Sequence, residues 1–288
     1  MNIDGKTRTL GVIGNPIEHT VSPVIHNNLA NITGDNFCYL PFKVEESNVK
    51  AAIEGAYALG ILGLNVTVPH KSAVIPYLKD IDPLAKRIGA VNTLVSCDGG
   101  YKGYNTDMPG LLRAMRSDGI EVKDKEVIVL GAGGVARAVA ILLSDSGAKH
   151  IYILNRTISK AKAIADEIIK DKGEIVTAME LSDYSKLSGN DYICIQATNV
   201  GMYPNTDCAV IDDNAFYDKI TKGYDIVYNP LETKFMKLCK EASAESFHGL
   251  KMLLYQGIIA YEYWSGKSIS DDDALKVYAK MLESMGKT

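Results

Sequence analysis

Cysteine is scarce in this 288-residue chain, and its five copies are irregularly spaced. No Cys-x-x-Cys pair occurs, so neither a disulfide framework nor a zinc site is expected. The five histidines also lack the spacing of metal ligands, and we expect each to be structural. These absences predict reduced thiols and no metal centre.

Long apolar runs and clusters of basic residues are missing as well. The first residues lack the apolar core of a signal peptide, and no run reaches the roughly 18 residues of a membrane span. The best candidate is interrupted by Arg137. The formal net charge is −4, and Lys and Arg are not gathered as nucleic-acid binding requires. We therefore expect a cytoplasmic protein, monomer or homodimer, whose partner is a small molecule rather than a membrane or a nucleic acid.

What is present is the pattern of an α/β protein. The chain is 47% apolar and 23% charged, and its length favours two domains. Short apolar runs alternate with amphipathic helical stretches, and a hairpin is expected around Asp98, Gly99 and Gly100. Apolar runs predict strands of a parallel sheet at KEVIVL, HIYILNRT, DYICIQAT and YDIVYNP, with helices from about residue 247. We place domain boundaries near 107/108 and near 240.

A glycine-rich motif stands between an expected strand and an expected helix. KEVIVL precedes Gly131-Ala132-Gly133-Gly134-Val135-Ala136, which matches G-x-G-x-x-G/A, and HIYILNRT supplies the next strand. The first glycine permits a tight turn, and the third residue of the motif lets the backbone approach a pyrophosphate at the helix N-terminus. This strand–turn–helix–strand unit predicts a dinucleotide-binding Rossmann domain.

The end of the second strand indicates which dinucleotide binds. An NAD-binding domain usually carries Asp or Glu there, bonded to the ribose 2′-hydroxyl. Here the strand ends in Asn155-Arg156-Thr157, with Lys160 one turn on. An arginine binds a 2′-phosphate through a charge-assisted, forked contact, so the sequence favours NADP.

The catalytic groups are less clear from the residues alone. Asn65-Val66-Thr67-Val68-Pro69-His70-Lys71 delivers polar residues and then a lysine at a strand end. Hydride transfer to a ketone needs a proton donor, and Lys71 beside Asp107 would form a charge-coupled acid/base unit. A solvated lysine and a helix N-cap explain the two residues equally well without catalysis.

Five segments together resemble the shikimate dehydrogenase family, also called shikimate/quinate dehydrogenases. They are GNPIEHTVSP, NVTVPHK, GAVNTL with YNTD, GAGGVARAVA with NRT, and YDIVYNP with GLKMLLYQG. They run in the family's order from residue 11 to 257. The resemblance implies an NADP-dependent oxidoreductase that interconverts 3-dehydroshikimate and shikimate, in aromatic amino-acid biosynthesis.

The resemblance also implies a domain plan and a set of residue roles. The N-terminal α/β substrate domain would comprise residues 1–107 plus about 241–288, whose C-terminal helices return to it, and the Rossmann-type NADP domain would comprise 108–240. Lys71 would act as proton donor or orienter at the reacting oxygen, and Asp107 would hold and polarise Lys71. The expected substrate-binding residues are Thr20, Ser22, Thr67, Asn92, Tyr228 and Gln256. The expected cofactor-binding residues are Gly131, Ala132, Gly133, Gly134, Val135, Asn155, Arg156, Thr157, Lys160, Thr198, Ile226 and Gly249.

Two departures from the family's pattern leave alternatives open. Thr20 stands where the family usually has serine, and Asn199 stands where serine is common. The methyl group of Thr20 leaves the choice between shikimate and quinate undecided. A quinate/shikimate dehydrogenase that also uses NAD, a folate-type methylene dehydrogenase and a non-catalytic nucleotide sensor remain the competing hypotheses.

Overall fold

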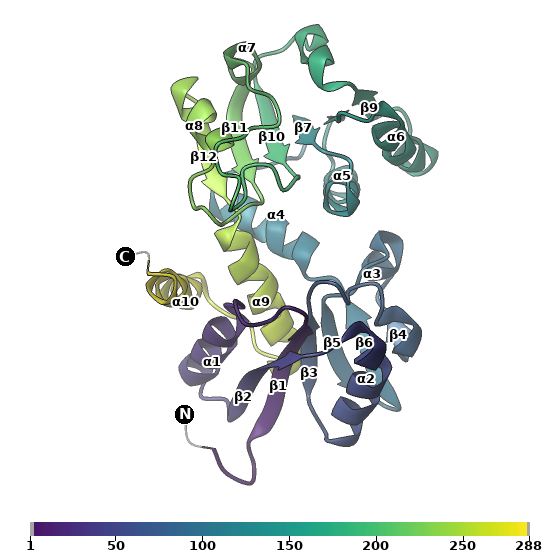
Figure 1. Ribbon diagram of the computed structural model, residues 1–288, viewed down its shortest axis with the longest axis vertical. Helices are drawn as coiled ribbons and strands as arrows, with labels where there is room; N and C mark the ends of the chain where they lie inside the picture. The colour runs from purple at the N-terminus through teal and green to yellow at the C-terminus, as the bar shows by residue number, and fades with distance from the viewer. Residues whose placement is uncertain (1–2, 287–288) are drawn as a thin grey trace. The chain divides into compact units, whose positions relative to one another are not determined.

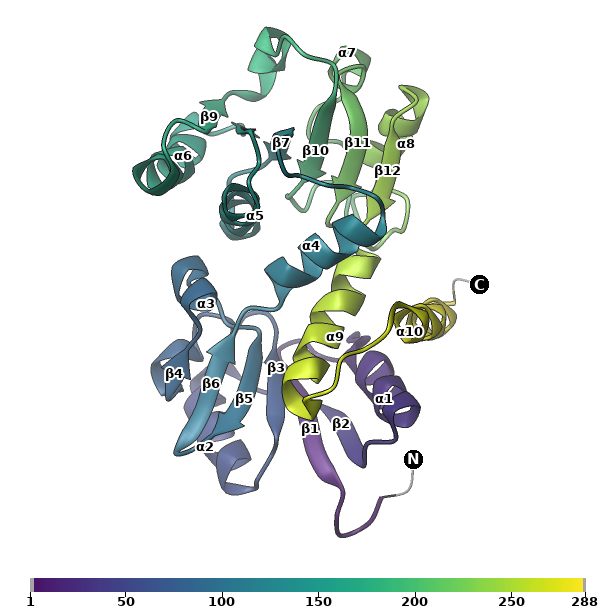
Figure 2. The same ribbon diagram turned by 180° about the vertical axis from the view of Figure 1, so that it is seen from behind.

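The computed structural model describes residues 3–286 and divides the chain into two compact units (Figures 1 and 2). Unit 1 contains the residues up to Gly110 and those from Leu253 onward, and unit 2 is Leu111–Met252. The sequence places the second boundary near 240. The structural division comes later because a further strand, Glu245–His248, joins the sheet of unit 2.

The sheet of unit 1 has six strands in the order β2-β1-β3-β5-β6-β4. β1, β2 and β3 are parallel, whereas β5 pairs antiparallel with both β3 and β6. The hairpin expected around Asp98 to Gly100 is therefore confirmed as the β5–β6 connection. The strands are β1 Arg8–Gly14, β2 Phe37–Lys43, β3 Gly63–Val66, β4 Asp80–Ile81, β5 Thr93–Cys97 and β6 Gly100–Tyr104.

Helices from both ends of the chain cover this sheet. Figures 1 and 2 show α2 against one face and α9 against the opposite face. A side chain at Gly63 would collide with Trp264 of α9, whose indole N–H donates to the Leu94 carbonyl at 2.9 Å. α9 therefore packs directly on β3 and β5. The helices are α1 Ser22–Thr33, α2 Val49–Ala58, α3 Pro83–Ile88, α9 Leu250–Ser265 and α10 Asp271–Ser284, with short 3-10 turns at Glu46–Asn48 and Ile75–Tyr77.

The sheet of unit 2 is entirely parallel, in the order β12-β11-β10-β7-β8-β9. Strand β7 is the first strand of this unit along the chain, and the strand order reverses between β7 and β10, so this is a doubly wound sheet of the Rossmann type. The strands are β7 Glu126–Leu130, β8 His150–Leu154, β9 Val176–Met179, β10 Tyr192–Gln196, β11 Ile220–Asp225 and β12 Glu245–His248.

Helices follow the strands of unit 2 as the parallel connections require. α7 and α8 share an apolar core with the sheet that includes Phe216, Tyr217 and Phe235. The helices are α5 Gly134–Asp145, α6 Ile158–Lys172, α7 Asn214–Tyr217 and α8 Lys234–Glu241, with a 3-10 turn at Leu181–Lys186. α4, Asp107–Ser117, precedes β7 and begins in the last residues of the first segment of unit 1. Across residues 3–286, none of the helices has both the length and the apolar character of a membrane span.

The strand expected at YDIVYNP is partly wrong. β11 is Ile220–Asp225, so only its last two residues belong to that run, and the apolar residues after Asp225 form a loop. The ladder stops there because the Val227 N–H is bonded by the Asp225 side chain at 2.9 Å instead of by a neighbouring strand.

Candidate active site

The loop after β3 places Lys71. Thr67 directly follows the strand, and a Cβ at Gly14 of β1 would collide with its methyl group. His70 is fully buried, and its Nε2 lies 2.7 Å from the Val44 carbonyl oxygen. The Lys71 carbonyl oxygen accepts from Val91 N at 2.8 Å. The backbone is therefore fixed immediately before and at the lysine.

Lys71 and Asp107 form a direct ion pair. Lys71 Nζ is 2.7 Å from Asp107 Oδ2, and the two side chains keep 33% and 19% of their surface exposed. The capping role that could explain Asp107 without catalysis is taken by Asn105, whose Oδ1 accepts from Met108 N at 3.3 Å. The structure thus brings the two predicted catalytic groups together and leaves them accessible to a ligand.

Asn92 is the centre of the hydrogen bonds around this pair. Its Nδ2 lies 2.9 Å from Asp107 Oδ1 and 3.3 Å from Gln256 Oε1 of α9, and its Oδ1 accepts from Thr106 N at 2.7 Å. A Cβ at Gly110 would be only 2.6 Å from Gln256 N, so the glycine allows α4 and α9 to meet here. Four predicted site residues are therefore joined in one network within unit 1.

A buried tyrosine extends this network and was not found from the sequence. Tyr39 Oη donates to Asn65 Oδ1 at 2.7 Å, and Asn65 Nδ2 donates to Thr93 Oγ1 at 3.1 Å. Burial raises the pKa of Tyr39 well above its usual value, and a hydrogen bond with Ser22 opposes this shift. A tyrosine in an apolar strand has no signal that separates it from the core, which is why the sequence did not reveal it.

The two hydroxyl residues at the start of α1 lie beside one another: Thr20 precedes the helix and Ser22 is its first residue. Thr20 Oγ1 accepts from Ser22 N at 3.3 Å, and Ser22 is nearly buried at 8% exposed. Thr20 itself is half-buried. Ser22 interacts with the hydroxyl of Tyr39, which in turn donates to Asn65. The predicted carboxylate-binding pair is therefore adjacent to this hydrogen-bond network.

The glycine turn of unit 2 fits a pyrophosphate. Gly131 has a φ of 113°, and a Cβ there would lie 2.7 Å from the methyl carbon of Thr198. Cβ atoms at Gly133 and Gly134 would meet no atom within 4 Å, so this backbone is bare and approachable. No side chain caps the first turn of α5, which leaves its N–H groups for an anion. Ala132 is half-buried and Val135 is 48% exposed beside the turn.

The turn after β8 fits a phosphate on the adenosine ribose. Asn155 Nδ2 donates to the Thr157 carbonyl oxygen at 2.9 Å, which shapes the turn. Arg156 and Lys160 are both exposed. The side chain of Thr157 does not cap α6, and the first turn of that helix carries no acidic residue. Two cations and free helix N–H groups are thus available to one dianion.

The other predicted cofactor residues, and Tyr228 of the predicted substrate set, lie at the carboxyl ends of β10, β11 and β12. Thr198 follows β10, Ile226 and Tyr228 follow β11, and Gly249 follows β12. A Cβ at Gly249 would collide with the Ile226 carbonyl oxygen, and Gly249 N donates to Val227 O at 3.0 Å. Tyr228 is 37% exposed, and its partial burial raises the pKa of its hydroxyl. All these segments share the edge of the sheet where dinucleotides bind in such folds.

Asp225 is a completely buried carboxyl group at this edge. Burial raises its pKa from 3.8 to about 6, opposed by hydrogen bonds from Thr233 and Val227. Cys194 of β10, Tyr217 of α7 and Cys239 of α8 also interact with it electrostatically, and burial raises the pKa of each. Those three groups stay neutral near pH 7. Of the four groups, Asp225, with a pKa of about 6, is therefore the one that changes charge near neutral pH.

Replacing Asp225 by Asn should change how stability depends on pH. The folded chain holds this proton more tightly than the unfolded chain, so the contribution of the group to the unfolding free energy falls as pH rises from about 4 to about 6. At about 1.4 kcal/mol per pKa unit, the loss is at most about 3 kcal/mol. Urea unfolding at pH 4 and pH 7 should show the Asn variant gaining up to this amount relative to wild type. A difference that does not change with pH would contradict the shift.

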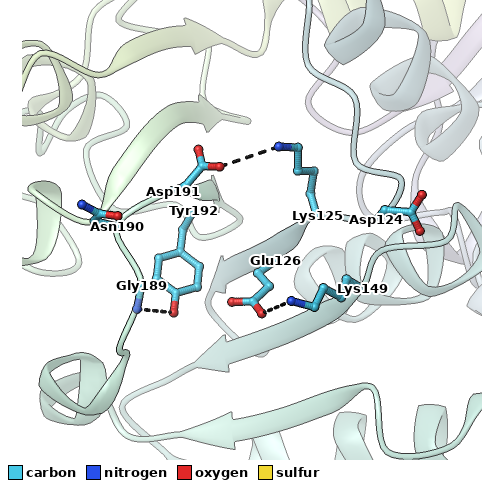
Figure 3. Close-up of a pocket in the computed structure, with 8 residues that line it drawn as sticks. All are labelled: Asp124, Lys125, Glu126, Lys149, Gly189, Asn190, Asp191 and Tyr192. Atoms are coloured by element: carbon cyan, nitrogen blue, oxygen red, sulfur yellow. Dashed lines mark hydrogen bonds and ion pairs between the residues drawn. The ribbon is translucent and has the colours of Figure 1, made fainter.

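A charged hollow of about 290 Å³ lies at the opposite end of the same sheet (Figure 3). Its charges are directed at one another: Lys149 Nζ is 3.0 Å from Glu126 Oε1, and Lys125 Nζ is 3.7 Å from Asp191 Oδ2. No ligand role follows from it. Among residues 3–286 there is also no group of three or more side chains arranged to hold a metal ion.

Two family models match the chain. The model described as "Shikimate dehydrogenase substrate binding domain" matches residues 12–94, and "Shikimate / quinate 5-dehydrogenase" matches residues 113–203. A shikimate dehydrogenase (NADP(+)) of Carboxydothermus hydrogenoformans is 42% identical over 93% of this chain and 95% of its own length. The chain belongs to the shikimate dehydrogenase family. The resemblance noted from the sequence is thereby confirmed.

Solved structures of shikimate dehydrogenases agree with the fold. A crystal structure of shikimate dehydrogenase in complex with NADP+ has a TM-score of 0.87 at 39% identity, covering 98% of this chain and 97% of that one. The shikimate 5-dehydrogenase of Listeria monocytogenes, in complex with shikimate and NAD, has a TM-score of 0.88 at 30% identity, covering 96% and 98%. The prediction of an α/β shikimate dehydrogenase with a Rossmann-type domain is therefore confirmed.

Proposed function

We propose that this chain interconverts 3-dehydroshikimate and shikimate by hydride transfer, with NADP as the hydride carrier, and that Lys71 and Asp107 are its catalytic residues. The observation that carries this proposal is the 2.7 Å pair of Lys71 and Asp107, held by Asn92 in the family's substrate-binding unit. NADPH, when bound, supplies the hydride that reduces the ring ketone.

Lys71 would give its proton to the oxygen that becomes the alcohol. Its Nζ bears three donors, of which Asp107 Oδ2 takes one, so donors remain for a substrate oxygen. Asp107 Oδ1 is bonded by Asn92, which keeps the carboxylate in one orientation toward the lysine. In the direction of shikimate oxidation the same pair would remove the hydroxyl proton.

The remaining residues would bind and orient the ring. Thr20 and Ser22 would donate their hydroxyls to the substrate carboxylate, and Thr67, Asn92 and Gln256 would bond the ring hydroxyls. Tyr228 would close the carboxylate end. Tyr39 and Asn65 would support Asn92, because Tyr39 donates to Asn65 and Asn65 Nδ2 donates to the Asn92 carbonyl oxygen.

The cofactor would be held along the carboxyl edge of the unit 2 sheet. The Gly131–Val135 turn would bind the pyrophosphate, the Asn155–Thr157 turn with Lys160 would bind the adenosine 2′-phosphate, and Thr198, Ile226 and Gly249 would meet the nicotinamide half. The bare backbone at Gly133 and the exposed Arg156 support this assignment.

The proposal is tested by the reduction of NADP+ at 340 nm with shikimate, run beside quinate and beside NAD+. We expect turnover with shikimate and NADP+, and a much lower rate with NAD+ because Arg156 would have no phosphate to bind. Turnover with quinate would show that the pocket around Thr20 admits the broader substrate. Absence of turnover with every pair would refute the enzyme assignment in favour of a nucleotide sensor. The oligomeric state and the cytoplasmic location stay predictions.

A further inference from the structure

Two completely buried polar side chains at the ends of β10 and β11 have no part in the proposed chemistry. Gln196 and Asp225 are partners in the parallel register of these strands, and neither exposes any surface. Gln196 Nε2 donates to Asp225 Oδ1 at 3.2 Å. Burying an amide and a carboxyl group together costs free energy unless both are hydrogen-bonded, so their other partners indicate what they do.

Gln196 holds the loop that follows β10. Its Oε1 accepts from Thr198 N at 2.6 Å and from Thr198 Oγ1 at 2.7 Å, and its Nε2 donates to the Val200 carbonyl oxygen at 3.0 Å. Thr198 Oγ1 in turn accepts from Val200 N at 3.1 Å. With a longer bond of 3.4 Å from Nε2 to the Thr198 carbonyl oxygen, one side-chain amide therefore bonds four polar groups of residues 198–200. It also fixes the Thr198 methyl group that stands against Gly131.

Asp225 holds the loop that follows β11 in the same manner. Its Oδ1 accepts from Val227 N at 2.9 Å, and its Oδ2 accepts from Thr233 Oγ1 at 2.6 Å. Thr233 is buried and caps α8, where Met236 N donates to its hydroxyl oxygen at 3.3 Å. The backbone of residues 226–227 is thus tied to the sheet and to the start of α8.

We propose that Gln196 and Asp225 are positioning residues for the nicotinamide half of NADP, which they serve by fixing the backbone of residues 198–200 and 226–227. The inference rests on the proposed cofactor assignment. If the adenosine half lies at the end of β8 and the pyrophosphate at the turn after β7, the rest of the dinucleotide extends over β10 and β11, the next strands in the sheet. Both side chains act through the backbone and touch no ligand.

The test compares two ligands that differ by the nicotinamide half of the dinucleotide. Isothermal titration of the full chain would measure NADP+ and adenosine 2′,5′-bisphosphate, which carries only the adenosine half. In Gln196→Ala we expect the Kd for NADP+ to rise about tenfold or more, the effect of losing one or two buried hydrogen bonds, with the Kd for the bisphosphate unchanged. Intact binding of the bisphosphate also shows that the unit is folded.

Substitutions at Asp225 separate geometry from charge. Asp225→Asn keeps the oxygen that accepts from Val227 and Gln196, and its amide can donate to Thr233, so we expect NADP+ affinity close to wild type. Asp225→Ala removes every acceptor and should weaken NADP+ as Gln196→Ala does. The matched control is Ser144→Ala, which deletes a buried hydroxyl of the same unit that bonds only to Ile141 O in α5, and should leave both ligands unaffected.

Two results would overturn the positioning role while the proposed function stands. One is wild-type NADP+ affinity in Gln196→Ala, and the other is an equal loss of both ligands, which would mean that the network merely stabilises the unit. A wild-type chain that binds shikimate but not NADP+ would instead refute the cofactor assignment, and this inference with it.

Discussion

Replacement of Lys71 by Ala is expected to lower kcat by a factor of about 10² to 10⁴, the usual contribution of a general acid or base. Lys71 is the ammonium group that the fold brings to Asp107 and leaves one-third exposed. Its removal takes away the proposed proton donor while the hydrogen bond from Asn92 to Asp107 remains. Steady-state rates with shikimate and NADP+ would measure the loss.

The same variant should bind NADP+ normally, because every proposed contact of the cofactor lies in unit 2. Lys71→Arg is the matched variant: it keeps the positive charge and a donor toward Asp107 but does not release a proton in a protein. We expect it to be nearly as slow as the alanine variant. Wild-type turnover in Lys71→Ala would remove Lys71 from the mechanism, whereas recovery in Lys71→Arg alone would mean that charge, not proton transfer, is what the residue supplies.

The second large effect is expected from Arg156→Ala. A charge-assisted hydrogen bond to a phosphate contributes about 1.5 to 3 kcal/mol, so the KM for NADPH should rise by about tenfold to a hundredfold. Arg156 is exposed at the end of β8, and it forms no part of the core that the substitution could disturb. The measurement is the KM for NADPH and for NADH with 3-dehydroshikimate as the second substrate.

NADH is the control that makes this prediction specific, because it lacks the 2′-phosphate. Its KM should be the same in wild type and in Arg156→Ala. Lys160→Ala should give a smaller increase for NADPH alone, since Lys160 would be the second of the two cations that face the phosphate. If the KM values for NADPH and NADH rise together, Arg156 supports the site in general and the explanation of NADP preference is lost.

The local sequence was sufficient to predict the glycine turn proposed to bind the cofactor, but it was not sufficient to predict that Lys71 and Asp107 form a pair. Gly131 to Ala136 run from the end of β7 into the first turn of α5, and each small residue has a steric reason that can be stated from the sequence alone. Lys71 and Asp107 are 36 residues apart, and their meeting depends on the antiparallel β5–β6 hairpin next to β3. Only the family resemblance placed them together before the structure did.

The parts that the sequence did not predict lack an apolar pattern or depend on distant partners. β12 has the sequence ESFH, and such a short, polar edge strand has no periodicity to detect. In the sequence, Gln196 is a polar residue at the end of an apolar strand, where an exposed side chain is equally common. Its burial becomes apparent only when Asp225, 29 positions later, is seen beside it.

Unit 1 is built from both ends of the chain, and this determines when it can be completed during synthesis. Its sheet is translated before unit 2, but the part of α9 that supplies Gln256 and the Trp264 contact with β3 and β5 is translated after unit 2. Unit 2 is contiguous and can fold as it leaves the ribosome, as domains generally do. A nascent chain would therefore complete the unit proposed to bind the cofactor before it completes the unit that holds Lys71 and Asp107.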